Sequence, residues 1–172
     1  MNLLVYDIFR IFVGMIITKD NINQFINNND WDDKDIMNCG NMGVTKIDYI
    51  PDNIKYLDCQ YNRLTELPKL PDGLKYLYCH SNRLTELPKL PESLEYLHCH
   101  SNKLTELPKL PESLEYLHCH SNRLTELPKL PDGLIHLYCE HNNNLPYKIT
   151  IKNLKQHNTL IKRKQILKRI CG

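Results

Sequence analysis

Apolar side chains recur along this chain in an order that repeats every 20 residues. The segment 74–93, LKYLYCHSNRLTELPKLPES, returns almost unchanged at 94–113, and near copies occupy 54–73 and 114–133. A weaker unit precedes these four, and a truncated one begins at Leu134. Such a period is typical of a solenoid, in which every unit stacks on the one before it.

Within one unit the pattern predicts a short strand followed by an extended return. Apolar and polar residues alternate from Leu77 to His80, which is the period of a half-buried strand. A single strand cannot bury its apolar side alone, so stacked turns must share one core. Pro88 and Pro91 exclude a helix from the rest of the turn and favour extended or polyproline-like backbone. We therefore expect an α/β solenoid with a concave parallel β-sheet and a convex side without helices.

One asparagine in each unit has a predicted structural role. Its side-chain amide can satisfy backbone groups where the strand bends out of the sheet and would otherwise leave them unpaired. Met42 stands at the equivalent place in the first unit, which we expect to be irregular. The asparagines are Asn62, Asn82, Asn102, Asn122 and Asn142.

Six of the seven cysteines follow the same period, and the strand geometry argues against disulfides or zinc. Stacked cysteines point the same way from parallel strands about 4.8 Å apart, beyond the usual Cβ spacing of a disulfide. Tetrahedral zinc needs ligands that converge from several directions, not a line. We expect buried thiols, which indicate a reducing compartment and a cytoplasmic location. The six are Cys39, Cys59, Cys79, Cys99, Cys119 and Cys139.

The unit L-x-x-L-x-C-x-x-N-x-L-x-x-L-P-x-L-P resembles the leucine-rich repeat, with cysteine in place of the third leucine. The 20-residue length and the double L-P step are similar to the short class found in secreted bacterial effectors and giant-virus repeat proteins. The resemblance implies a leucine-rich-repeat horseshoe over residues 34–147 that binds a protein partner, without a cofactor. For a viral protein it would place the chain in the host cytoplasm.

Strand alternation places a second set of side chains opposite the core, on the concave side of the sheet. Tyrosine and histidine offer flat, amphipathic contact area, and tyrosine is enriched among residues that dominate protein interfaces. We expect this surface, called the Tyr/His face below, to recognise a protein partner. It consists of one file with Tyr56, Tyr76, Tyr96, Tyr116 and His136, a second with Asp58, Tyr78, His98, His118 and Tyr138, and a third with His80, His100 and His120.

Two other functions remain open at this point. Neighbouring imidazoles on adjacent strands could share a divalent metal, although no carboxylate lies among His98, His100, His118 and His120. The sequence contains no phosphate loop, dinucleotide fingerprint, zinc-protease motif or nucleophile elbow, so we expect no enzymatic activity.

The second open function concerns the N-terminal segment 1–33. Polar or small breaks three or four residues apart predict a helix over 3–18, and a second short helix is expected after Asp20, together forming a cap. The segment also resembles a degenerate F-box, which implies a ubiquitin-ligase adaptor. Its predicted linker contacts are Ile8, Phe9 and Phe12.

The C-terminal segment 148–172 differs in charge from the rest of the chain. It holds eight basic residues and no acidic one, which leaves 14 basic against 20 acidic residues in 1–147, a net charge of −6. Alternation over 147–151 predicts a last strand, and the spacing of Leu154, Ile161, Leu167 and Ile170 predicts a helix that closes the final turn. The cations would then be a solvated face, with nucleic acid or anionic lipid as the alternative partners. No transmembrane span is expected.

Overall fold

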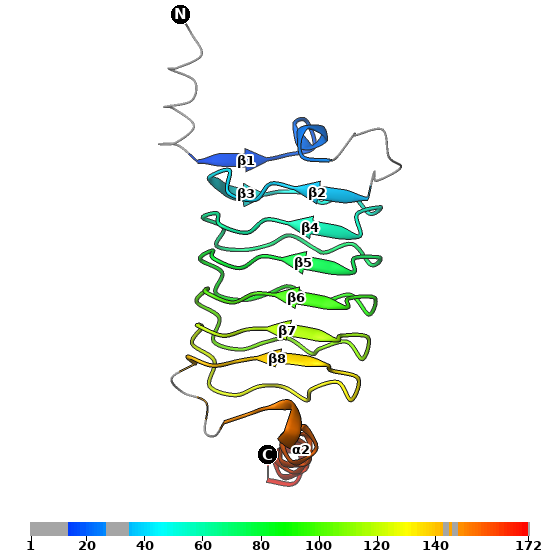
Figure 1. Cartoon of the computed structure of the whole chain (residues 1–172), viewed down its shortest axis with the longest axis vertical. Helices are drawn as coiled ribbons and strands as arrows, with labels where there is room; N and C mark the ends of the chain where they lie inside the picture. The colour runs from blue at the N-terminus through cyan, green and yellow to red at the C-terminus, as the bar shows by residue number, and fades with distance from the viewer. Residues whose placement is uncertain (1–13, 27–34, 143–144, 146–147, 172) are drawn as a thin grey trace, which may run out of the picture.

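A parallel β-sheet built from one short strand per repeat runs the length of the molecule (Figure 1). The computed structural model describes residues 14–26, 35–142, 145 and 148–171. The sheet has the order β2-β4-β5-β6-β7-β8, and each strand pairs with the next in parallel, shifted by 20 residues. The strands are β2 (Ile36–Asn38), β4 (Tyr56–Asp58), β5 (Tyr76–Tyr78), β6 (Tyr96–His98), β7 (Tyr116–His118) and β8 (His136–Tyr138).

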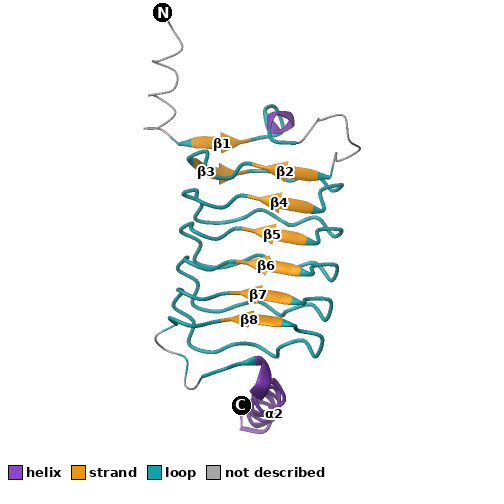
Figure 2. Cartoon of the chain, in the orientation of Figure 1, coloured by secondary structure: helices purple, strands orange, loops and turns teal. Residues whose placement is uncertain are grey.

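The core is a continuous stack of the same side chains from turn to turn. Leu77 and Cys79 are fully buried, and so are their equivalents in the turns on either side. Among the described residues, the returning part of each turn between β4 and β8 contains no helix, as the prolines predict (Figure 2). The predicted solenoid fold is therefore confirmed. The proposed division of the chain at residues 33 and 147 stays a prediction.

The asparagine of each unit joins two neighbouring turns, as predicted. The Asn82 Nδ2 donates to the carbonyl oxygens of Cys59, at 2.9 Å, and Cys79, at 3.2 Å. Its Oδ1 accepts the backbone N–H of Leu64 at 2.9 Å. The same three bonds recur at Asn102 and Asn122. One side chain thus satisfies backbone groups that the bend removes from the sheet.

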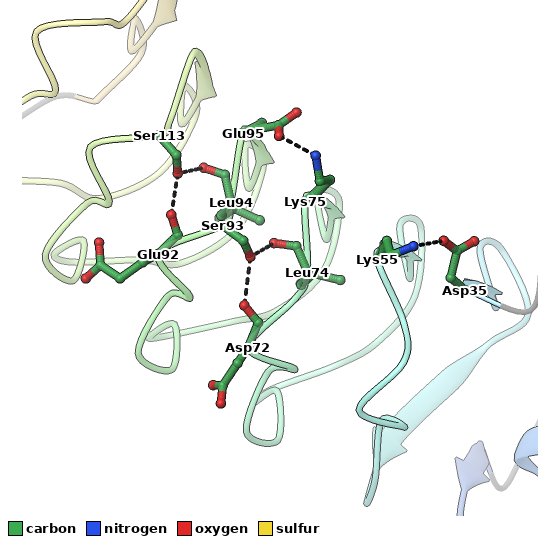
Figure 3. Close-up of polar contacts among 10 residues, drawn as sticks. All are labelled: Asp35, Lys55, Asp72, Leu74, Lys75, Glu92, Ser93, Leu94, Glu95 and Ser113. Atoms are coloured by element: carbon green, nitrogen blue, oxygen red, sulfur yellow. Dashed lines mark hydrogen bonds and ion pairs between the residues drawn. The ribbon is translucent and has the colours of Figure 1, made fainter.

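A second link between turns lies on the opposite side of the repeat (Figure 3). The Ser93 Oγ lies 2.8 Å from the carbonyl oxygen of Asp72 and 2.7 Å from that of Leu74, so its hydroxyl hydrogen bonds to the preceding turn. Ser113 likewise bonds to the turn before it, at 2.7 Å to the carbonyl oxygens of Glu92 and Leu94. Two other units have Gly73 and Gly133 at this position and lack the hydroxyl.

The N-terminal end is covered by a strand and a 3-10 turn. The predicted helix over 3–18 is wrong for Met15–Ile17, which form β1 and pair in parallel with β3 (Val44–Ile47) in a separate two-stranded sheet. Gly14 has a φ of +77°, and a Cβ there would overlap the Thr45 side chain, so the chain enters β1 through a position suited to glycine. Residues 3–13 lie outside the described part.

The short helix predicted after Asp20 is present as the 3-10 helix η1 (Ile22–Gln24). Ile17, Ile22 and Phe25 are buried against the first turn. This end is therefore covered by strand β1, which pairs with β3. The open edge of β3 presents unpaired backbone N–H and carbonyl groups, which a strand can pair with and a helix cannot.

The C-terminal end is closed by the helix α2 (Leu154–Cys171), preceded by the 3-10 helix η2 (Ile151–Asn153). The last strand predicted over 147–151 is wrong for the described residues 148–151. The Asn153 side chain accepts the N–H of Thr150 at 2.7 Å and donates to the carbonyl of Lys148 at 2.8 Å, which turns the backbone into η2.

Helix α2 covers the final turn with its first half only. Leu154 and Ile161 are buried as predicted, but Leu167 and Ile170 are exposed, so the prediction that they close the turn is wrong. The Asn158 side chain satisfies backbone groups of the last turn: it accepts the N–H of Leu130 and donates to the carbonyl of Leu130, both at 2.8 Å. The carbonyl of Pro128 lies 2.9 Å from the His157 Nε2.

Candidate functional site: the Tyr/His face

The Tyr/His face is built by register alone. Because each strand is shifted by 20 residues from its neighbour, equivalent side chains lie directly beside one another across β4 to β8. Leucine and cysteine point into the core, so the intervening side chains must point the other way. The thirteen predicted site residues therefore all lie on one side of the sheet.

The first file is a stack of phenol rings. The Tyr96 and Tyr116 rings are 4.2 Å apart between centroids with planes 9° from parallel. Tyr76 stacks on Tyr96 at 4.7 Å, and His136 continues the stack beyond Tyr116 at 4.7 Å. Partial desolvation and then the neighbouring Tyr116 hydroxyl raise the pKa of Tyr96 to about 12. The Tyr96 phenol is therefore a neutral hydrogen-bonding group at physiological pH.

The second file has imidazoles at its centre and edge-on tyrosines at both ends. His98 and His118 stack with centroids 4.1 Å apart and planes 14° from parallel. Tyr78 meets His98 edge-on at 4.7 Å, and Tyr138 meets His118 edge-on at 4.6 Å.

The third file stacks three imidazoles. His80, His100 and His120 follow at centroid distances of 4.3 Å each. The Nδ1 atoms of His100 and His120 lie 3.2 and 3.1 Å from the hydroxyls of Ser101 and Ser121. His80 is buried, and its Nδ1 has no hydrogen-bond partner among the described residues.

The ring spacings on this side follow the spacing of the strands. Neighbouring parallel strands are about 4.8 Å apart, and the stacked ring pairs lie between 4.1 Å, at His98 and His118, and 4.7 Å, at Tyr76 and Tyr96. One short strand per repeat thus brings equivalent rings within stacking distance.

Burial keeps the central histidines neutral. Burial, and after it the neighbouring His118 imidazole, lowers the pKa of His98 to about 4. Burial and then the His80 imidazole lower the pKa of His100 to about 4 as well. The pKa values of His80 and His118 are also lowered, again chiefly by burial. A stack of imidazoles cannot all carry charge in half-buried positions, so the centre of the face is uncharged at pH 7.

A carboxylate marks one end of the face. Asp58 is buried, and its oxygens accept the backbone N–H of Gln60 at 3.1 Å and the Gln60 Nε2 at 2.9 Å. Its predicted place in the second file is correct, but its side chain is held by Gln60. Glu140 lies at the other end, in the position equivalent to His80.

The face also includes residues that sequence reasoning missed. Tyr61 lies edge-on against His80 with centroids 5.2 Å apart, and Ser101 and Ser121 contact the imidazoles before them. All three stand at the same repeat position, where the backbone φ is between 54° and 55° for the serines and 52° for Tyr61. The period could have revealed them, because this position directly follows the third file.

The imidazole stacks are a poor arrangement for a metal. The lone pairs of an imidazole lie in the ring plane, so those of stacked rings run side by side and do not converge on one point. Within the described ranges, no group of three or more histidine, cysteine, aspartate or glutamate side chains is placed to hold a metal ion.

The periodic cysteines lie on the other side of the sheet, in the core. All six are free and buried. Burial raises the pKa of Cys99 to about 12 and, with the Glu140 carboxylate second, that of Cys139 to about 11. These thiols are packed as small apolar side chains.

The F-box prediction stays a prediction. Ile8, Phe9 and Phe12 lie outside the described residues. Ile16, which belongs to the same predicted helical motif, lies on strand β1. In the described part of the chain, no helix has the length and apolar character needed to cross a bilayer.

Comparison with known proteins places the repeats among those of bacterial effectors. The leucine-rich-repeat domain of a Shigella effector is 35% identical over 75% of this chain and 60% of that one, with a TM-score of 0.66. YopM, a leucine-rich effector protein from Yersinia pestis, is 33% identical over 68% of this chain and 31% of its own, with a TM-score of 0.59.

The chain thus spans 60% or less of the length of these two proteins. No family model matches the chain. No curated protein matches it either. Two features of the fold agree with this likeness to the effector repeats: the register of 20 residues and the stacked leucines. The chain is a solenoid of 20-residue repeats, consistent with the short class of leucine-rich repeats, and its structural neighbours are leucine-rich-repeat proteins of bacteria.

Proposed function

We propose that the Tyr/His face binds a protein partner and that the chain acts as an interaction scaffold. The likeness to the repeats of bacterial effectors supports such a scaffold in general terms. The observation that carries the proposal for this face is the unbroken stacking of aromatic rings across β5 to β8, from Tyr76 to His136 in the first file.

Stacking prepares the face for binding. The inner rings of the files, such as Tyr96, Tyr116 and His98, each lie between two neighbours, so little of their side-chain entropy remains to be lost when a partner arrives. Phenol hydroxyls and imidazole nitrogens stand at the edges of apolar rings, which combines contact area with hydrogen bonding. The neutral centre favours a partner with an uncharged, partly apolar surface, because a buried unpaired charge would be costly.

The scaffold is proposed to act by binding and not by catalysis. The periodic cysteines would be the natural nucleophiles of this chain. Their thiols are buried and their pKa values are raised, for example to about 12 at Cys99, which makes them unreactive.

The proposal is tested by affinity purification from the native cell with matched variants. The face variant is Tyr96→Ser with His118→Ser. The control is Lys89→Ser with Lys109→Ser, two residues in the extended returning part of each turn. Thermal unfolding establishes that both variants fold. We expect the face variant to lose at least about tenfold of the recovered partner, and the control to keep it. Equal recovery by the two variants would overturn the proposal.

A further inference from the structure

Among the residues that the structure describes, none packs over the second half of α2. Leu154, His157 and Ile161 of the first half are buried against the last turn. Every residue from 162 to 170 is exposed, on all sides of the helix. In Figure 1 the helix follows β8 at the end of the stack, where no further turn covers it. A helical segment of this length is marginal in water by itself, so a surface that packs against it would stabilise it.

Four exposed aliphatic side chains form a strip along α2 that runs from one flank to the side facing away from the last turn. The buried residues 154, 157 and 161 define one side of the helix by their spacing of three and four. By the same geometry residues 166 and 170 fall on the opposite side, and residues 160 and 167 lie beside them on one flank. The exposed fractions are 42% for Leu160, 46% for Ile166, 59% for Leu167 and 74% for Ile170.

Cations lie within and beside this aliphatic surface. Arg163 lies within it, Lys162 and Arg169 flank it, and all three are exposed. Lys168 is also exposed, on the other side of the helix. Lys164 pairs with Glu126 of the last turn at 3.1 Å and so ties the root of the segment to the solenoid. Residues 148–172 contain no acidic side chain, in a chain whose remainder is acidic. The segment therefore combines an apolar side with an uncompensated positive charge.

We propose that this outer face of α2 binds the surface of an anionic lipid bilayer, with the helix lying in the plane of the interface. Aliphatic side chains would enter the headgroup boundary, and the flanking lysines and arginines would contact anionic headgroups while their stems stay apolar. Stable binding would need both the aliphatic side chains and the cations, since apolar burial and electrostatic attraction add in such helices.

The four aliphatic side chains distinguish a bilayer from the other candidate occupants. A nucleic acid would neutralise the cations but leave Leu160, Leu167 and Ile170 in water, and the one aromatic ring of α2, that of His157, is buried and cannot stack on bases. A second copy of this chain could cover these side chains with its own aliphatic surface only by bringing two sets of cations together, since residues 148–172 contain no acidic side chain.

The test is flotation of the full chain with vesicles of phosphatidylcholine alone or with 30% phosphatidylserine. We expect binding to the anionic vesicles, weakened by raised salt, and at least about tenfold less binding to the neutral ones. Leu167→Gln with Ile170→Gln, and separately Arg163→Gln with Arg169→Gln, should each reduce binding at least about tenfold. Lys69→Gln with Lys89→Gln, in the extended returning part of each turn, is the matched control and should bind as the parent does.

Three results would overturn the inference. The first is absence of binding to anionic vesicles by a parent chain that unfolds cooperatively. The second is binding that the aliphatic variant leaves unchanged, especially together with tight binding to a labelled oligonucleotide, which would identify a purely electrostatic site. The third is a dimer in analytical ultracentrifugation that the aliphatic variant dissociates, which would make a second copy the occupant. Partner capture by the Tyr/His face does not depend on any of them.

Discussion

His98 and His118 lie face to face on neighbouring strands, with ring centroids 4.1 Å apart and planes 14° from parallel. This contact is available to neutral rings and is opposed by like charge when both are protonated. Stability should therefore depend on pH in a direction that the structure defines.

Acidification should destabilise the protein between about pH 6.5 and pH 4. The pKa of His98 is about 4 in the folded chain, against about 6.5 when unfolded, so the unfolded state binds the proton first as pH falls. The stability is fully present above pH 6.5 and is lost as pH falls towards the folded pKa. Thermal unfolding from pH 7.5 to 3.5 measures the loss, and His98→Gln with His118→Gln should flatten the curve. An identical pH dependence in that variant would refute the role of the stack.

Removal of one asparagine of the column should destabilise the whole solenoid. Asn122 is buried, and its side chain accepts the N–H of Leu104 at 3.0 Å and donates to the carbonyl of Cys99 at 3.0 Å. Asn122→Ala leaves these groups unpaired, at a cost of about 2–3 kcal/mol in the free energy of unfolding. Urea unfolding measures the loss, with the exposed Arg123→Ala as control. A loss as small as that of the control would show that water replaces the amide.

The periodic cysteines should resist thiol reagents while the chain is folded. Cys59 and Cys79 are fully buried, and burial raises their pKa values well above the usual range. We expect iodoacetamide at pH 7.5 to modify them only after unfolding in guanidinium chloride. Mass spectrometry of digested protein gives the extent of reaction at each site. Rapid modification of most of the six in the native protein would contradict burial.

A serine at position 133 should stabilise the last full turn. Ser113 bonds to two carbonyl oxygens of the preceding turn, whereas Gly133 has no side chain and its nearest neighbour, the Glu112 carbonyl oxygen, would lie 4.0 Å from a Cβ. Gly133→Ser completes the bridge without a clash and should add about 0.5–1.5 kcal/mol to the free energy of unfolding.

Two further variants separate the causes of that gain. Gly133→Ala contributes only the reduced entropy of the unfolded chain, so it should stabilise less than serine does. Ser113→Gly should destabilise the neighbouring turn. Equal effects of alanine and serine in denaturant unfolding would show that the hydroxyl bridge contributes nothing.

Much of the fold was predictable because a solenoid makes only neighbour contacts. Alternation at Leu77-Tyr78-Cys79-His80 identifies the core side and the Tyr/His face, and the period of 20 gives the register without knowledge of any distant contact. The asparagine column was predictable for the same reason, since every unit repeats the same bend. The placement of the thirteen predicted residues on one side follows from this register.

The ends were not predictable, because the repeat no longer applies there. An apolar run such as Met15–Ile17 can be buried as a helix or as a strand, and the open backbone of β3 decided for the strand. At the other end, the spacing of Leu167 and Ile170 predicts a helix but does not show where the surface beneath it stops. An 18-residue helix is about 27 Å long, and α2 is buried only as far as Ile161.

The amino-acid sequence alone determined the repeat, the strand, the core and which side chains share a face, because each depends on local periodicity and on contact between identical neighbours. Only the tertiary structure decided how the ends are covered, that Tyr61 lies against His80, and that the central imidazoles are desolvated enough to stay neutral. These features depend on how closely side chains from different turns approach one another, and distance and solvent exposure arise only when the turns are stacked.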